Sequence, residues 1–438
     1  MPQWGRLDPE VREAVEVVSL VLPFRTNAYV MEELIDWRKT PDDPMFQLTF
    51  PQRGMLSDAQ YEAMASLVRA EAPREVLKAE ANRIRAQLNP HPAGQMTHNV
   101  PRVNGRPLPG VQHKYRETVL FFPSHGQTCH AYCTFCFRWA QFVGLEDLKF
   151  ASREAGDLVA YLREHPDVTD VLLTGGDPMV MKSRVLRKYV EPLLELEQLI
   201  TIRIGTKSIA YWPHRYVTDQ DADDVLELFE QVVDAGKQLA VMAHASHPVE
   251  NSTDMAREAV RRIRATGANI RMQSPVVRHV NDEPQVWADL WRDGVRIGCI
   301  PYYMFVERDT GARGYFEIPL ARCWDIFQNA YREVSGMCRT VRGPSMSAFP
   351  GKVHVLGLTT IGGEKAFALE YLQAREAGLV RRPFFARFDP TATWFDQLRP
   401  LTERDRPFFP AAPARSDATP TVVLTTSGEH AARGERDC

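Results

Sequence analysis

The 438-residue sequence lacks several features that would place it in a simple class. No stretch approaches the ~18 consecutive apolar residues of a membrane span. The N-terminus, MPQWGRLDPEVREA, has neither the basic start nor the apolar core of a signal peptide. The formal net charge is only −3, which gives no sign of a protein that binds nucleic acid or a membrane surface. We therefore expect a cytoplasmic protein whose partners are small molecules.

Cysteine is also scarce, with seven in the whole chain. Three of them, Cys129, Cys133 and Cys136, lie close together in CHAYCTFC, and no fourth is nearby. A structural zinc site usually takes four thiolate or imidazole ligands, so this run does not fit one. Three thiolates on a four-iron cluster would leave one iron free for an outside ligand. Three unrelated buried cysteines are a weak alternative, because the other four are widely scattered and close spacing in a cytoplasmic protein favours a metal or redox site.

From about residue 118, short apolar runs alternate with longer amphipathic segments. Six runs are candidate strands: 119–122, 170–175, 200–205, 238–243, 269–274 and 297–303. Helical patterns lie near 152–164, 183–198, 219–235, 252–266, 284–294 and 319–334. This alternation is typical of βα units on a parallel sheet. The sequence therefore predicts an α/β fold, a partial (β/α)6 TIM-like barrel whose chemistry gathers at the carboxyl ends of the strands.

The predicted barrel spans 111–335 and has a segment on each side. Residues 1–110 carry helical patterns such as Asp58–Leu88 and then a Pro-rich passage, which predicts a helical extension and a linker. Residues 336–410 form a further segment. The tail, 411–438, is rich in Ser, Thr, Ala and Pro, a composition typical of a disordered chain.

A second motif, TGGDPM, follows the second candidate strand. Gly175 and Gly176 would let backbone groups come close to a ligand, and Asp177 could accept hydrogen bonds from an ammonium group. Alone the motif is weak, because Gly-Gly-Asp-Pro is also an ordinary turn. Together with the cysteine run, however, it resembles the radical S-adenosylmethionine (SAM) superfamily.

In that superfamily three cysteines hold a 4Fe–4S cluster, and the free iron chelates the amino and carboxylate groups of SAM. The resemblance implies a cluster on the three clustered cysteines and SAM contacts from the Gly-Gly-Asp motif. It further implies reductive cleavage of SAM to a radical that abstracts a substrate hydrogen, with an electron donor such as flavodoxin or ferredoxin. The cofactor supplies that chemistry, and the protein positions it.

Five further stretches match the motifs of one family in order and at similar spacing: LPGVQHKYRETVLF, TIRIGTKS, HASHP, QSPVVRHVND and PYYMF. This is the lysine 2,3-aminomutase family, and the resemblance covers roughly residues 30–360. Its members move an α-amino group to the β-carbon and use pyridoxal 5′-phosphate (PLP), which an enzyme lysine binds as an imine when substrate is absent. The resemblance also suggests a homo-oligomer.

The resemblance assigns roles to three further residues. Gln273 would contact SAM. Arg138 would hold the substrate α-carboxylate through its guanidinium fork, the alternative being a solvated arginine. Lys352, in FPGKVHVLG, would bind PLP, although the family usually has a longer glycine run there and a surface lysine in a turn would also explain the local sequence.

The PLP phosphate site departs from the family pattern. Its arginines before the first strand are replaced by Lys114 and Thr118, with Arg116 nearby. Use of PLP is therefore less secure than use of SAM. The C-terminal cysteine cluster that gives some members a structural zinc is absent, since only Cys438 lies beyond Cys338, and no zinc is predicted.

The substrate pocket departs as well. Lysine-specific members hold the distal ammonium of the substrate with two acids, which map here to Arg308 and to the neighbourhood of Ser345, where the segment has no acid. Cationic or neutral groups there would repel an ammonium or leave it unpaired. An arginine instead suits an acidic distal group, as in the glutamate 2,3-aminomutases of the family. A shift of one residue would bring Asp309 into the site, so both alignments stay open.

We therefore predict a radical SAM, PLP-dependent amino acid 2,3-aminomutase whose substrate is not L-lysine and could be acidic. One alternative is a radical SAM enzyme of the same fold that catalyses another hydrogen abstraction or rearrangement without PLP. The other is a cluster-binding scaffold without catalytic activity.

Overall fold

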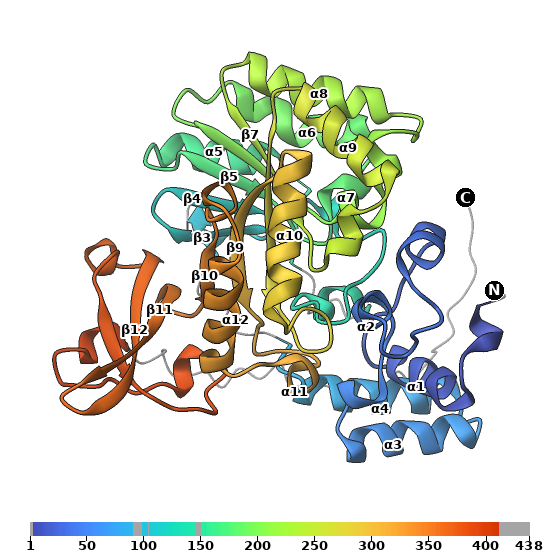
Figure 1. Cartoon of the computed structure of the whole chain (residues 1–438). Helices are drawn as coiled ribbons and strands as arrows, with labels where there is room; N and C mark the ends of the chain where they lie inside the picture. The colour runs from blue at the N-terminus through green and yellow to red at the C-terminus, as the bar shows by residue number, and fades with distance from the viewer. Residues whose placement is uncertain (1–2, 91–98, 104, 145–149, 154, 411–438) are drawn as a thin grey trace, which may run out of the picture.

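The computed structural model describes residues 3–90, 99–103, 105–144, 150–153 and 155–410, so the predicted disordered tail lies outside the described residues. The described part is built around an eleven-stranded sheet with strand order β13-β12-β11-β10-β9-β8-β7-β6-β5-β4-β3, beside a small β1-β2 ribbon. In Figure 1 the blue N-terminal helices and the orange C-terminal strands lie on opposite sides beneath the helix-covered barrel.

The strands are β1 (Arg102–Val103), β2 (Arg106–Pro107), β3 (Val111–Tyr115), β4 (Thr118–Phe121), β5 (Asp170–Leu173), β6 (Thr201–Thr206), β7 (Gln238–His244), β8 (Asn269–Val276), β9 (Ile300–Val306), β10 (Arg342–Ser347), β11 (Gly351–Ile361), β12 (Glu364–Ala374) and β13 (Phe384–Arg387). The helices are α1 (Pro9–Ser19), α2 (Pro44–Thr49), α3 (Asp58–Arg69), α4 (Arg74–Gln87), α5 (Ala155–Glu164), α6 (Ser183–Leu194), α7 (Ser208–Tyr211), α8 (Ala222–Asp234), α9 (Asp254–Ala265), α10 (Pro284–Ile297), α11 (Arg313–Phe316) and α12 (Leu320–Arg332).

Strands β4 to β9 form the barrel. Each pairs in parallel with the next along the chain, and helices α5, α6, α8, α9 and α10 lie in the connections between them. These strands coincide with the six candidate strands to within a few residues, and α12 follows the last of them. The predicted partial (β/α)6 barrel is therefore confirmed.

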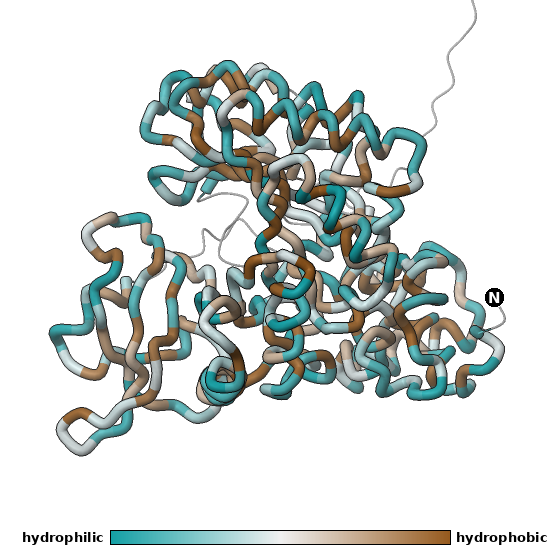
Figure 2. The backbone as a smooth tube through the Cα atoms, turned by 45° about the horizontal axis from the view of Figure 1, so that its top comes forward, coloured by the Kyte–Doolittle hydropathy of each residue, from teal (hydrophilic) through white to brown (hydrophobic). Residues whose placement is uncertain are grey.

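The barrel strands have two different faces. On β5 and β6 the side chains of Val171, Leu173, Ile202 and Ile204 are fully buried against the covering helices. The alternate residues, such as Arg203, face the opposite side and are only half-buried. Because side chains alternate along a strand, one face forms the core and the other lines the inside of the curved sheet. Figure 2 shows the hydrophobic stretches, in brown, running along these strands.

The N-terminal extension packs as a separate core that reaches the cysteine run. Its helices α1 to α4 bury their apolar side chains together with Ala131, Trp139 and Tyr211. The helical stretch 58–88 is two helices, because Pro73 lies between α3 and α4 and cannot continue the hydrogen-bond ladder. This extension therefore supports the loop that carries the cysteines.

The C-terminal segment continues the barrel sheet. Strand β10 pairs in parallel with β9, and β11 to β13 then add antiparallel strands with their own apolar core. We keep the division of the chain near residues 110 and 335 as a proposal. Within the described residues, none of the helices combines the length and apolar character needed to span a bilayer.

Candidate functional site

The three clustered cysteines lie on the loop that follows β4. The N-terminal extension holds this loop through its backbone: Tyr132 N donates to Arg25 O at 2.9 Å, and Thr134 N donates to Leu48 O at 3.0 Å. The side chain of Asn27 also donates to the carbonyl of His130 at 3.3 Å. Contacts from residues 25–48 of the extension thus fix the path of the loop.

The thiols of Cys129, Cys133 and Cys136 are free. Burial raises the pKa of all three, that of Cys136 to about 12, so a nearby metal charge is needed to keep them as thiolates. In the part of the chain that the structure describes, no three His, Cys, Asp or Glu side chains converge on one metal ion. A four-iron cluster does not require such convergence, because each thiolate binds a different iron. The three cysteines therefore fit a cluster better than a single ion.

Gly175 and Gly176 pack directly against the residues that precede the first cysteine. A Cβ atom on Gly176 would lie 2.3 Å from the carbonyl oxygen of Thr128, and one on Gly175 would lie 2.1 Å from Nε2 of Gln127. The amide of Asp177 also donates to the Thr128 carbonyl at 2.6 Å. The structure thus gives the two glycines a packing role, and their predicted contact with SAM stays a prediction.

The buried carboxylate of Asp177 is occupied by protein groups. It accepts hydrogen bonds from Thr206 Oγ1 at 2.7 and 2.8 Å, from Met179 N at 2.9 Å and from Lys207 N at 2.9 Å. These contacts join the turn after β5 to the end of β6. The predicted role of Asp177 toward an ammonium group of SAM therefore also stays a prediction.

Gln273 lies on β8 beside the end of β7. Its side-chain nitrogen is 3.1 Å from Nε2 of His244. Burial, together with the nearby Lys207, lowers the pKa of His244 to about 3, so the imidazole is neutral and accepts this hydrogen bond. Gln273 thus lies at the carboxyl ends of the strands, where SAM was predicted.

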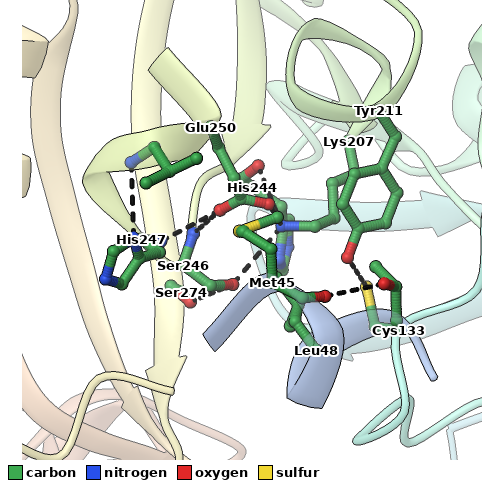
Figure 3. Close-up of polar contacts among 12 residues, drawn as sticks. Met45, Leu48, Cys133, Lys207, Tyr211, His244, Ser246, His247, Glu250 and Ser274 are labelled. Atoms are coloured by element: carbon green, nitrogen blue, oxygen red, sulfur yellow. Dashed lines mark hydrogen bonds and ion pairs between the residues drawn. The ribbon is translucent and has the colours of Figure 1, made fainter. Parts of the chain in front are cut away.

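A buried ion pair near these residues was missed in the sequence (Figure 3). Lys207 Nζ lies 2.5 Å from Glu250 Oε1, 3.3 Å from Ser246 Oγ and 4.6 Å from the ring centroid of Tyr211. The hydroxyl of Tyr211 in turn lies 3.5 Å from the sulfur of Cys133. The stretches TIRIGTKS and HASHP contain Lys207 and Ser246, and these were the local signals of the network.

Arg138 is buried, with 6% of the residue exposed, so the alternative of a solvated arginine is wrong. Its guanidinium carbon lies 4.0 Å from the ring centroid of Phe122 and 5.3 Å from that of Phe137. Burial lowers its pKa to about 9. Among the described residues, no side chain forms a hydrogen bond or ion pair with this guanidinium group, so its charge is available to an anion.

Arg308 also lies near the ring of Phe137. Its guanidinium carbon is 5.5 Å from the ring centroid of Phe137 and 5.7 Å from that of Trp394. Its Nε is buried and has no hydrogen-bond partner among the described residues. Asp309 instead meets the side chain of Asn89, which donates to its backbone carbonyl at 2.6 Å. The Oδ1 atom of Asp309 is also buried without a hydrogen-bond partner among the described residues, so both alignments left open by the sequence stay open.

Lys114 faces the same region from β3. Its Nζ donates to the carbonyl of Ala348, and burial, followed by the charges of Arg308, Arg375 and Lys352, lowers its pKa well below the usual value. The two other residues considered for a phosphate site point elsewhere: Arg116 is exposed and pairs with Asp167 at 2.9 Å, and Thr118 donates to Asp170 at 2.9 Å.

Lys352 lies within β11, so the alternative of a surface lysine in a turn is wrong. Its Nζ is 4.4 Å from the ring centroid of Tyr303. Burial is the main cause that lowers its pKa to about 8, and the charges of Arg203 and Arg342 act in the same direction, while Tyr302 opposes them. A lysine amine with a lowered pKa is neutral, and hence nucleophilic, in a larger fraction of molecules at neutral pH.

Two more residues complete this part of the site. Ser345, on β10, is fully buried, and its hydroxyl has no partner among the described residues. Arg375 follows β12 and donates to the carbonyl of Phe349 at 3.0 Å and to Asn99 Oδ1. Sequence reasoning missed Arg375, because no local pattern distinguishes it from a surface arginine.

Four buried or half-buried cations and the exposed Arg375 therefore gather in one region, which we call the chamber. Arg138 and Arg308 repel each other, and Lys114 is repelled by Arg308, Arg375 and Lys352. No described carboxylate forms an ion pair with any of the five. An unpaired buried charge costs several kcal/mol. Such a chamber suits a ligand that carries carboxylate or phosphate groups.

A partial parallel barrel with a Cys-x3-Cys-x2-Cys loop after its first strand defines the class of radical SAM enzymes. No family model matches the chain. A protein of Aquifex aeolicus (strain VF5), named as a candidate L-lysine 2,3-aminomutase, is 30% identical over 393 residues, which cover 90% of this chain and 92% of that protein. The chain belongs to the lysine 2,3-aminomutase family.

Other relatives match over about half of their length. The L-lysine 2,3-aminomutase of Bacillus subtilis (strain 168) is 27% identical over 230 residues, 52% of this chain and 46% of that protein. The glutamate 2,3-aminomutase of Clostridioides difficile (strain 630) is 25% identical over 209 residues, 48% of this chain and 47% of that protein. A solved radical SAM methyltransferase from Sphaerobacter thermophilus matches with a TM-score of 0.36 and 14% identity, covering 66% of this chain and 93% of that one, a likeness too weak to bear on function.

The protein is thus a radical SAM enzyme of the aminomutase class, as the sequence predicted. Its family implies SAM and a 4Fe–4S cluster as cofactors and a small molecule as substrate.

Proposed function

We propose that the protein is a PLP-dependent amino acid 2,3-aminomutase that acts on an amino acid with an acidic side chain. The observation that carries this proposal is a group of cations, Arg138, Arg308, Lys114, Lys352 and Arg375, none of which forms an ion pair with a described carboxylate, although Asp309 lies close enough to Arg308 to act on its pKa. An ammonium group at the distal end of a substrate would be repelled there, whereas carboxylates and a phosphate would neutralise the chamber.

The cluster and PLP would be held by different residues in separate parts of the site. Cys129, Cys133 and Cys136 would hold the cluster. Lys352 would hold PLP through its amine, and Lys114 would face the phosphate group. When bound, the cluster with SAM supplies hydrogen abstraction and PLP carries the migrating amino group. The chain contributes position, charge and the exclusion of water.

The two arginines would hold the two ends of the substrate. Arg138 and Arg308 both lie over the ring of Phe137, at 5.3 and 5.5 Å from its centroid. A short dicarboxylate between them would have its α-carboxylate at Arg138 and its distal carboxylate at Arg308. A charge-assisted hydrogen bond of this kind contributes ~1.5–3 kcal/mol, enough to select an acidic over a basic amino acid.

A second candidate is a radical SAM enzyme of this fold that does not use PLP. The position of Thr118 favours it, because this residue binds Asp170 and leaves Lys114 as the only one of the three predicted phosphate ligands that faces the chamber. Borohydride reduction of the enzyme with PLP, followed by peptide mapping, separates the two candidates, since only the first retains PLP on Lys352.

The proposed function is tested by anaerobic incubation of the reconstituted enzyme with SAM, a reductant and single amino acids. Glutamate, aspartate, alanine and lysine form the panel, and mass spectrometry measures 5′-deoxyadenosine and β-amino acids. We expect a β-amino acid from an acidic substrate. Deoxyadenosine without any β-amino acid would favour the second candidate, and the absence of deoxyadenosine would favour the scaffold.

A further inference from the structure

The Tyr211 hydroxyl meets a cluster cysteine. Tyr211 ends the short helix α7 and is 1% exposed, and its oxygen lies 3.5 Å from the sulfur of Cys133. Figure 3 shows the ring pointing its hydroxyl at this sulfur. Among the described residues, no side chain forms a hydrogen bond with the sulfur of Cys129 or Cys136. The backbone of Arg138 donates a hydrogen bond to Cys136, so it is the side-chain contact from Tyr211 that is particular to Cys133.

Tyr211 is held through both its backbone and its ring. Its backbone carbonyl accepts a hydrogen bond from Asn27 at 3.0 Å, and the same amide group of Asn27 lies 3.3 Å from the carbonyl of His130 on the cysteine loop. Lys207 Nζ lies 4.6 Å from the ring centroid and forms a 2.5 Å ion pair with Glu250. The hydroxyl is thus fixed relative to the loop that it meets.

The neighbourhood of Lys207 is itself fixed. Glu250 is fully buried, and its other oxygen accepts hydrogen bonds from the amides of Ser246 and, at 3.0 Å, His247. The ammonium of Lys207 therefore has little freedom to leave the face of the ring. A cation on a tyrosine ring face is a favourable contact, and it draws electron density away from the hydroxyl.

We propose that Tyr211 donates a hydrogen bond to the Cys133 sulfur of the bound cluster and raises the reduction potential of that cluster, with Lys207 and Glu250 as positioning residues. The direction of the bond follows because a ligating cysteine is a thiolate without a proton, so only the hydroxyl can donate. Reduction adds one electron and one negative charge to the cluster. A hydrogen bond to a ligand sulfur stabilises the more negative state and shifts the potential upward.

This inference rests on the proposed cluster ligands, and its test is separate from theirs. Tyr211→Phe removes the hydroxyl and keeps the ring. Tyr216→Phe is the matched control, because Tyr216 is equally buried and its hydroxyl bonds to the Ser208 hydroxyl at 2.7 Å, not to a cysteine sulfur. Both variants and the wild type are reconstituted anaerobically, analysed for iron and sulfide, and titrated with a mediator series while the reduced cluster is followed by electron paramagnetic resonance.

We expect Tyr211→Phe to retain the iron of the wild type and to have a more negative midpoint potential, while Tyr216→Phe keeps the wild-type value. An unchanged potential in an iron-loaded Tyr211→Phe protein would overturn the role of Tyr211 and leave the cluster assignment intact. Failure of the assignment itself has a different signature, which is full iron content in Cys133→Ala.

If Tyr211→Phe takes up less iron, the contact between the Tyr211 hydroxyl and the cluster is tested in the wild-type sequence instead. The enzyme is produced with 3,5-difluorotyrosine, which places fluorine nuclei beside the Tyr211 hydroxyl, and the reduced cluster is examined by electron nuclear double resonance. A fluorine coupling that is absent from the Tyr211→Trp variant supports the contact. No fluorine coupling in the iron-loaded wild type overturns it.

Discussion

The region around the three clustered cysteines, called the cysteine side, and the chamber around Lys352, called the lysine chamber, differ in how their charged groups are paired. Near the cysteines, Lys207 pairs with Glu250 and the carboxylate of Asp177 accepts hydrogen bonds from Thr206 and two amides. Around the lysine chamber, Arg138 and Arg308 face aromatic rings and each other, and neither forms an ion pair with a described carboxylate, although Asp309 lies near Arg308. The charged groups of the first region are thus paired within the protein, although Gln127 Oε1 and His130 Nδ1 are buried there without a hydrogen-bond partner among the described residues. The cations of the second region lack such pairs.

This difference separates what the chain builds from what a ligand must supply. Paired polar groups around the cysteine loop keep the backbone in place before and after cofactors bind. Unpaired buried cations instead store electrostatic attraction for a ligand that brings negative charge. Removal of a cysteine ligand should therefore abolish the cluster, and substitutions in the chamber should weaken or change the binding of anionic ligands.

The largest expected effect is on the cysteine side. Cys133→Ala should abolish the four-iron cluster, as should the same change at Cys129 or Cys136, because three thiolates leave no spare ligand. Iron and sulfide analysis after anaerobic reconstitution is the measurement. Cys323→Ala is the control, since Cys323 is buried in α12, and it should keep full iron content. Full iron in Cys133→Ala would contradict the assignment.

Lys352→Ala should have the next largest effect, on PLP alone. The variant should retain iron and lose the PLP that borohydride fixes to the wild type, because it lacks the amine that holds the cofactor. Lys365→Ala is the matched control, as Lys365 is an exposed lysine on the neighbouring strand β12. Equal trapping in Lys352→Ala and the wild type would show that another lysine binds PLP, or that binding is non-specific.

Arg308→Asp should change the choice of substrate. Two acids would then face each other, and loss of one charge-assisted contact of ~1.5–3 kcal/mol corresponds to roughly a 10- to 150-fold loss of kcat/KM for glutamate. Arg308→Asp should also gain some turnover of lysine. This gain is limited because position 345, where lysine-specific members have a second acid nearby, is still a serine. Arg339→Asp, at an exposed arginine, is the control. A wild-type preference for lysine that Arg308→Asp leaves unchanged would show that Arg308 does not face the substrate.

The smallest expected effect is a pH dependence of Lys352. Its pKa of about 8 lies below the usual 10.5 because the charged amine is buried. The neutral fraction, and with it the rate of covalent PLP attachment to the apoprotein, should rise roughly tenfold between pH 7 and pH 9. Absorbance after rapid mixing measures this rate. A rate that rises only near pH 10, as for an exposed lysine, would contradict burial of the amine.

The lowered pKa of Lys352 also makes the free energy of unfolding depend on pH. Between about pH 8 and pH 10.5 the folded protein binds fewer protons at Lys352 than the unfolded chain does. The contribution of this residue to the free energy of unfolding therefore increases as the pH rises through that window.

The barrel could be predicted because its signals are local. Each strand of β4 to β9 is a short apolar run, and each connecting helix shows the 3.6-residue period, so the alternation is visible without tertiary information. The antiparallel strands β11 to β13 were not predicted. These strands pair with one another, and β11 pairs with β10, through contacts that no local sequence pattern predicts. The sequence of this segment drew attention to Lys352 alone.

The site was predictable only where residues are neighbours in sequence. The cysteine run is such a case. Tyr211 meets Cys133 across 78 positions, and Asn89 meets Asp309 across 220, so neither contact leaves a local pattern. Burial of Lys352 likewise follows from the packing of the C-terminal strands against the barrel.

The central claim is that the unpaired cations select an acidic substrate, and a competition experiment tests it most directly. The reconstituted enzyme, with SAM, PLP and reductant, receives glutamate and lysine in equal amounts, and mass spectrometry measures the two β-amino acids in one reaction. The account predicts β-glutamate in large excess. An excess of β-lysine would contradict it and would show that the charge of Arg308 is not presented to the substrate.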